Sequence, residues 1–148
     1  MPATLQKILQ KIKTDSTVVE LQGLSGSSKA LVLSMLGPKS VKSAEKVIPY
    51  IVVCESFAVA DVLLKDLSYY FGKEGVHFFP FWDVLPYDNF SPHKGLVAQR
   101  FQALDALLKG KVRILVTTPN GLMQRFLTRE TFQKNTILLN TEFVGNPE

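Results

Sequence analysis

The sequence is poor in the residues that build disulfide frameworks, metal sites and membrane spans. Cysteine occurs once in 148 residues, as Cys54, so no intramolecular disulfide can form. The two histidines, His77 and His93, are too few for the usual His and Cys zinc sites. The longest apolar run, residues 47–54, is well short of the roughly 18 residues that a membrane-spanning helix needs. No secretory signal is recognised at the N-terminus. We therefore expect no metal, no membrane contact and a reducing, cytoplasmic location.

The charge is modest and is spread along the chain. Seventeen Lys and Arg against thirteen Asp and Glu give a net charge of +4, and 46% of the residues are hydrophobic, which excludes disorder. Residues 1–46 and 111–148 are net basic, whereas residues 47–110 are net acidic. No block of five or six like charges occurs. This distribution favours an ordinary solvated surface over a concentrated nucleic-acid groove.

Strand and helix patterns alternate along the chain. Strands are predicted at Thr17–Leu21, Val47–Cys54, Val76–Phe79, Arg113–Thr117 and Asn135–Leu139. Helices are predicted at Thr4–Lys13, Ser28–Leu36, after the cap Ser56, through Val97, Phe101, Leu104 and Leu108, and from Pro119 to about Leu127. This alternation predicts one α/β domain over residues 1–139, with a mainly parallel sheet sandwiched by helices. Residues 140–148 are interpreted as the start of a following subdomain.

Two element details can be checked against a structure. Val47–Cys54 is apolar almost throughout, which predicts a strand covered on both faces. Thr118 followed by Pro119 predicts an N-cap and a proline at the first helical position.

The main chemical signal is the turn G-L-S-G-S-S-K-A at residues 23–30, between a predicted strand and a predicted helix. A working phosphate loop reads G-x-x-x-x-G-K-[S/T]: its backbone N–H groups wrap the phosphates, its lysine reaches them and its hydroxyl binds Mg²⁺. Gly23 and Lys29 stand at the correct spacing, and Gly26 adds flexibility, but Ser28 replaces the second glycine and Ala30 replaces the hydroxyl. The sequence predicts a degenerate nucleotide site without productive hydrolysis.

Two alternatives for this turn stay open. Its helix N-terminus could hold a sulfate or phosphate weakly. Gly23 and Gly26 could also simply make a strand-to-helix turn. No catalytic residue is predicted anywhere in the chain, because two histidines do not support the assembly of a Ser–His–Asp set.

Residues 79–93 are rich in aromatic side chains that could stack on nucleic-acid bases: Phe79, Phe81, Trp82, Tyr87 and Phe90. Asp83 and Asp88 oppose the nearby positive charge of His93 and Lys94, so packing of this loop onto the sheet is favoured. Cys54 is interpreted as a small buried apolar residue. The best candidates for exposed contacts with anions or partners are Arg100, Arg125 and Arg129, with a solvated helix face as the alternative.

Three segments in order resemble a known family: L-Q-G-L-S-G-S-S-K-A at 21–30, W-D-V-L-P-Y-D-N-F-S-P-H at 82–93 and T-T-P-N-G-L-M-Q-R-F at 117–126. Together they resemble the N-terminal module of bacterial transcription-repair coupling factors, which is similar in fold to domain 1 of the excinuclease protein UvrB. The resemblance implies a P-loop, RecA-like helicase-type domain that has lost its nucleotide site.

The resemblance also implies partners. In this family the module helps to recruit the excinuclease protein UvrA, mainly through the following subdomain, and packs against other domains of the same protein. RNA polymerase and DNA are engaged by the full-length protein, whose separate motor uses ATP and Mg²⁺. No cofactor is therefore expected for the residues present here.

One departure from UvrB concerns DNA. That relative inserts a long aromatic hairpin after the region matching Tyr87–Pro92, whereas here residues 91–94 pass directly into a predicted helix. The sequence therefore favours a non-catalytic interaction and scaffold module. An active ATP-binding helicase-type domain and a direct DNA-binding module remain the alternatives.

Overall fold

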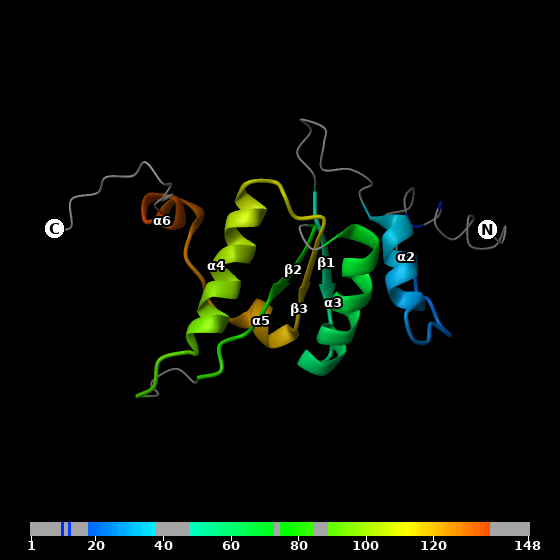
Figure 1. Ribbon diagram of the computed structural model, residues 1–148, viewed down its shortest axis with the longest axis horizontal. Helices are drawn as coiled ribbons and strands as arrows, with labels where there is room; N and C mark the ends of the chain where they lie inside the picture. The colour runs from blue at the N-terminus through cyan, green and yellow to red at the C-terminus, as the bar shows by residue number, and fades with distance from the viewer. Residues whose placement is uncertain are drawn as a thin grey trace.

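Three parallel strands form a sheet with helices on both faces (Figure 1). The computed structural model describes residues 10, 12, 18–37, 48–72, 75–84 and 89–136. The strands are β1 (Tyr50–Val53), β2 (Val76–Phe79) and β3 (Ile114–Thr117), in the order β1-β3-β2. Ile114 at the start of β3 is in register with Tyr50 of β1 and with Val76 of β2. The predicted α/β class with a parallel sheet is confirmed.

The helices lie on the two sides of this sheet. They are α2 (Ser28–Leu36), α3 (Phe57–Phe71), α4 (Lys94–Leu108), α5 (Pro119–Met123) and α6 (Arg129–Lys134). Figure 1 shows α2 and α3 on one side of the sheet and α4 on the other. Among the described residues, no helix combines the length and the apolar character that crossing a membrane requires.

Each face of the sheet has its own hydrophobic core, because side chains alternate between the two faces of a strand. On the α3 side, Ile114 and Val116 of β3 pack with Leu63 and Leu67 of α3. On the α4 side, Leu115 of β3 packs with helix alanines and with Phe79 at the end of β2. β3 therefore contributes to both cores and holds the layers together.

Several predicted boundaries are confirmed. α2 and β2 have the predicted bounds, and α3 begins after Ser56, whose hydroxyl accepts a hydrogen bond from the Val59 N–H at 3.4 Å. β3 begins one residue later than predicted. Of the predicted helix Thr4–Lys13, only residues 10 and 12 are described, and both are helical.

The predicted strand Thr17–Leu21 is wrong where it can be examined. Residues 18–21 belong to no strand, and Val18 is fully exposed. A β-branched run favours a strand only when a neighbouring strand supplies the hydrogen bonds and the packing. Within the described residues, the sheet contains no strand beside this segment.

The C-terminal predictions need correction as well. The predicted strand Asn135–Leu139 follows a helix that the sequence analysis missed, α6, and residues 135 and 136 are not in a strand. Residues 137–148 lie outside the described residues. α5 ends at Met123, four residues before the predicted end at Leu127.

β1 is less covered than its apolar sequence predicts. Ile51 and Val53 are about half exposed, at 57% and 49%. Ile51 lies opposite Leu115, which faces α4, but α4 packs over β2 at the far edge of the sheet. This face of β1 therefore has no helix above it among the described residues.

Candidate functional site

The candidate phosphate loop lies at the edge of the sheet where the strands end. Figure 1 shows the blue segment before α2 at the same end of the molecule as α5, which follows β3. Ligands of open parallel α/β sheets commonly bind at this carboxyl edge. The loop therefore lies where a ligand of such a sheet could bind, but residues 18–21 before it form no strand, and the geometry of the loop decides what it can hold.

Two glycines give the loop its shape. Gly23 has a φ of 80° and Gly26 a φ of 52°, both in the left-handed region that other residues rarely adopt. No atom lies within 4 Å of a Cβ built at either glycine, so backbone conformation is what requires glycine there. The sequence placed a glycine turn here correctly, but the turn leads into α2 from a segment that is not a strand.

Ser28 uses its polar groups inside the loop. Its hydroxyl donates to the Ser25 carbonyl oxygen at 2.6 Å, and its backbone N–H donates to the same oxygen at 3.2 Å. A loop that wraps phosphates needs such N–H groups to point at the ligand. Because the Ser28 N–H points back at Ser25, this donor is lost to any bound anion.

Ala30 faces away from the loop. Its side chain is 0% exposed and belongs to the core between α2 and α3, with Cys54, Ala60 and Leu63. A methyl group offers no oxygen to a metal ion, and Mg²⁺ requires oxygen ligands. The structure therefore separates position 30 from Lys29, which is exposed on the loop side of α2.

Lys29 lies at a cavity of about 750 Å³ between α2, β1 and α3. Gly26 and Cys54 also line this cavity, together with two carboxylates, those of Glu55 and Asp66. Most of the other lining residues are Leu and Val. The two carboxylates repel an anion, so the cavity is a poor fit for a polyphosphate.

Cys54 is buried, as the sequence analysis predicted, at 6% exposure. Burial raises the pKa of its thiol, the positive charge of Lys29 acts in the opposite direction, and Glu55 adds to the rise. A thiol with a raised pKa stays protonated near neutral pH and is a weak nucleophile and metal ligand. Among the described residues, no three His, Cys, Asp or Glu side chains gather in a metal site.

Arg100 is the functional candidate that the sequence analysis places wrongly. The prediction is an exposed side chain, but Arg100 is 2% exposed, whereas Arg125 and Arg129 are exposed. Its guanidinium lies over the Phe79 ring at 4.1 Å and over the Trp82 ring at 4.5 Å. One terminal nitrogen, NH1, donates to the Pro80 carbonyl oxygen at 2.5 Å.

The aromatic loop is confirmed as a packing element in part. Phe79 is buried and Trp82 is half-buried, but Phe90 is 79% exposed, and Tyr87 lies outside the described residues. The Gln124 side chain makes two hydrogen bonds to the backbone of Trp82. Its oxygen accepts from the Trp82 backbone N–H at 2.5 Å, and its amide nitrogen donates to the Trp82 carbonyl oxygen at 3.3 Å.

A signal for the buried arginine was present in the sequence. Arg100 follows Val97 by three residues and precedes Leu104 by four, so it lies within the apolar stripe of α4. The structure buries Arg100, Ala103 and Ala106, and leaves Phe101 41% exposed. The predicted apolar face was therefore rotated by about one residue.

Comparison with known proteins points to one group. No model of a protein family matches the chain. Transcription-repair-coupling factor from Haemophilus influenzae is 38% identical over 77 residues, which is 52% of this chain and 6% of that protein. The proteins of the same name from Rickettsia prowazekii (27% over 73 residues, 49% of the chain and 6% of that protein) and Escherichia coli (41% over 44 residues, 30% and 4%) also match.

The chain thus spans a small share, about 6%, of the first relatives that it matches. The similarity covers about half of the chain and points to the same family as the resemblance noted in the sequence. This chain is related in sequence to the transcription-repair coupling factors.

Proposed function

We propose that this chain is a non-catalytic interaction and scaffold module that takes part in the coupling of transcription to DNA repair. The sequence relationship to transcription-repair coupling factors supports a role in this process. The module would have a helicase-type, RecA-like ancestry, with a phosphate loop that no longer holds a nucleotide. Its proposed partners are the excinuclease protein UvrA and other domains of the same protein, with RNA polymerase and DNA engaged by the full-length protein.

The observation that carries the non-catalytic part is the arrangement of residues 28–30. The Ser28 N–H and hydroxyl are bonded to Ser25, and Ala30 is a buried methyl group where a metal-binding hydroxyl would be needed. Lys29 alone supplies one positive charge, which cannot replace the N–H groups and the metal that a nucleoside triphosphate requires. The proposal therefore assigns no cofactor to this chain and leaves ATP and Mg²⁺ to a separate motor.

Calorimetry tests the proposal in two arms. In the first, Mg-ATP is titrated into the 148-residue chain, and we expect no saturable heat in the chain or in Lys29→Ala. Micromolar, magnesium-dependent binding that disappears in Lys29→Ala would instead establish an active nucleotide site, the second candidate.

In the second arm, purified UvrA is titrated into the same chain. Saturable but weak binding is expected, because the resemblance places most of the UvrA contact in the following subdomain. If neither UvrA nor a Mg-ATP complex binds, and a DNA duplex binds with a steep loss of affinity as salt is raised, the direct DNA-binding alternative replaces the proposal.

A further inference from the structure

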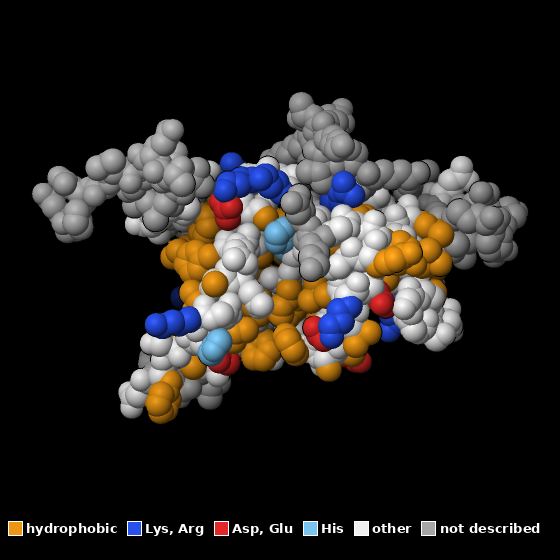
Figure 2. Space-filling model, in the orientation of Figure 1, with side chains coloured by type: hydrophobic (Ala, Val, Ile, Leu, Met, Phe, Trp, Pro, Cys, Tyr) orange, Lys and Arg blue, Asp and Glu red, His pale blue; other side chains and the backbone are white. Residues whose placement is uncertain are grey.

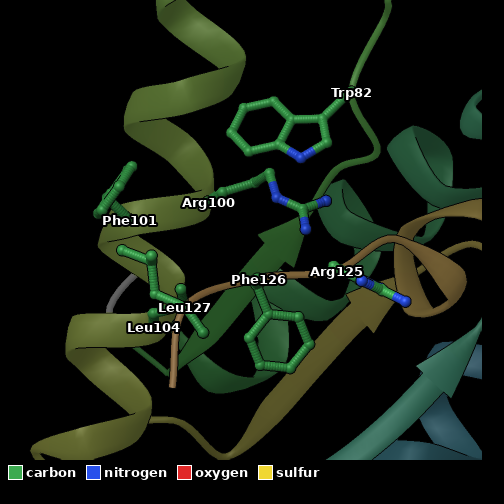
Figure 3. A pocket seen from close by; sticks show the side chains of 7 residues that line it. All are labelled: Trp82, Arg100, Phe101, Leu104, Arg125, Phe126 and Leu127. Carbon is green, nitrogen blue, oxygen red and sulfur yellow. The ribbon is translucent and has the colours of Figure 1, made fainter. Parts of the chain in front are cut away.

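A second cavity, of about 490 Å³, lies between α4 and the segment that follows α5. Figure 3 shows the residues that line it: Trp82, Arg100, Phe101, Leu104, Arg125, Phe126 and Leu127. The volume is within the range of about 300–1,000 Å³ typical of ligand pockets. None of the lining residues belongs to the candidate phosphate loop, so this is a separate site.

The wall of the cavity contains a buried positive charge that no described residue pairs. The Nη2 nitrogen of Arg100 has no hydrogen-bond partner in the described part of the chain, although the side chain is 2% exposed. Among the described residues, the ion pairs are Lys65 with Asp61 and Lys109 with Asp105, and neither involves Arg100. Burial lowers the pKa of Arg100, but a guanidinium keeps its proton at any physiological pH.

An unpaired buried charge is costly, and proteins normally pair such charges. Figure 3 shows the Trp82 ring beside the Arg100 guanidinium, while the end of the Arg125 side chain points away from it. The two aromatic contacts of Arg100 and its bonds to Pro80 and Gln124 satisfy part of the group. The unpaired Nη2 atom has almost no accessible surface, so an anion reaches this donor only when a neighbouring side chain moves aside.

The surroundings of the cavity are apolar and exposed. Phe101, Phe126 and Leu127 line it and are 41%, 58% and 44% exposed. Figure 2 shows apolar side chains at the surface beside α4. The charged lining residues are both arginines, Arg100 and Arg125, and no acidic side chain is among the described residues that line the cavity. This combination is complementary to a segment that carries a negative charge next to a large apolar side chain.

We propose that this cavity binds a protein segment in which a glutamate or aspartate stands beside a large apolar residue. The half-buried Trp82 side chain moves aside, the carboxylate pairs with the uncovered Nη2 atom of Arg100, and the apolar side chain occupies the space between Trp82, Phe126 and Leu127. The inference rests on the proposed interaction function, because it names the surface that such a module would use.

Nucleic acid fits this cavity less well than an acidic peptide. A nucleic-acid strand brings regularly spaced phosphates and is usually bound along a positively charged groove. Here the exposed acidic residues Asp83 and Glu130 lie close in sequence to Trp82 and Arg129, and most of the cavity wall is apolar. A peptide segment with one carboxylate and an apolar neighbour needs only one cation, which Arg100 supplies.

Trp82 makes the cavity directly measurable, because it is the single tryptophan of the chain. The test titrates the 148-residue chain with the blocked peptide acetyl-Phe-Glu-Leu-amide and records the Trp82 emission. The control ligand is acetyl-Phe-Gln-Leu-amide, which has nearly the same shape without the charge. We expect a saturable change with the Glu peptide and an affinity at least about tenfold lower for the Gln peptide.

Two variants locate the binding site without removing the buried arginine. Phe126→Ala removes one wall of the cavity from a partly exposed position, and we expect it to weaken Glu-peptide binding by about tenfold. Tyr69→Ala changes a side chain on α3 that is 86% exposed, and it should leave the affinity unchanged. Circular dichroism confirms that both variants are folded.

Four outcomes overturn the proposal. The first two are equal affinity for the two peptides and no change of Trp82 emission at millimolar Glu peptide. The other two are an unchanged affinity of Phe126→Ala for the Glu peptide, and quenching of the Trp82 emission by oligo-dT but not by the Glu peptide. None of these results changes the outcome of the titration with UvrA, so the two proposals fail separately.

Discussion

At the scale of single residues, Gly121 shows how closely α5 approaches the sheet. A Cβ built at this position would lie 2.5 Å from the Thr117 hydroxyl oxygen and 3.0 Å from the Phe79 carbonyl oxygen. Those two atoms are themselves hydrogen-bonded at 2.8 Å, with Thr117 as the donor. The glycine is therefore required by space, since real Cβ atoms do not come this close to other atoms.

We predict that Gly121→Ala lowers the free energy of unfolding by about 1–3 kcal/mol, because the methyl group must displace a backbone carbonyl or break the Thr117 hydrogen bond. Urea denaturation followed by circular dichroism measures the change. Asn120→Ala is the matched control, since it alters an exposed neighbour in the same helix and should stay within about 0.5 kcal/mol of the parent. Equal stability of the two variants would contradict the close approach.

Sequence reasoning identified some residues and misplaced others for physical reasons. The need for glycine at positions 23 and 26 could be predicted, because left-handed turns have a strong residue preference. The burial of Arg100 was missed, because charge is normally a reliable sign of exposure, and only the pairing of Arg100 with two aromatic rings reverses it. The position of Arg100 in the apolar stripe of α4 was a signal for burial, but the rings that cover its guanidinium are set by α4 meeting β2, which is not a local property.

At the scale of elements, the two predicted N-caps behave differently. Ser56 caps α3 through its hydroxyl, which accepts from the Val59 N–H. Thr118 stands before Pro119 at the start of α5, but its side chain makes no cap bond and its buried hydroxyl has no partner. Thr118 therefore occupies the predicted N-cap position, with Pro119 at the first helical position, but it supplies no side-chain cap bond.

We predict that Ser56→Ala destabilises the protein by about 0.5–1 kcal/mol, since it removes a long cap bond. Thr118→Val should be neutral or slightly stabilising, because it replaces an unpaired buried hydroxyl with a methyl group of similar shape. Thermal unfolding of both variants and the parent checks the contrast. A larger loss of stability in Thr118→Val than in Ser56→Ala would contradict a cap bond at Ser56 and an unpaired hydroxyl at Thr118.

Elements with strong local signals could be predicted, and those that depend on neighbours could not. α2 has its predicted bounds because Gly37 follows it at once, and β2 lies between a turn and a proline. Residues 18–21 carry the same β-branched pattern as β1 but belong to no strand. α6 was missed because its six residues, R-E-T-F-Q-K, bury only Phe132 and so show little apolar periodicity.

At the scale of the whole molecule, β3 joins two cores that lie on opposite faces of one sheet. Ile114 and Val116 face α3, while Leu115 faces α4. A small sheet with shared central residues is expected to unfold as one unit, because neither core can persist without β3. The parallel arrangement followed correctly from the alternation of elements along the chain.

We predict that Leu67→Ala, which empties a fully buried position in the core on the α3 side, destabilises the protein by about 2–5 kcal/mol. The Trp82 emission, which reports on the opposite side of the sheet, should shift its denaturation midpoint together with circular dichroism. Lys65→Ala on the exposed side of α3 serves as the control. An unchanged Trp82 midpoint in Leu67→Ala would show that the two sides unfold independently.

The hydrogen bonds between Gln124 and Trp82 join groups that are 42 residues apart in the chain. Closing such a loop costs chain entropy, and contacts between residues close in sequence do not offset it. The contact between Gln124 and Trp82 is therefore expected to form late in folding, after β2 and β3 have paired. The cavity beside Arg100 is then the last part of the molecule to acquire its shape. Binding of a ligand in this cavity would therefore require the fully folded protein.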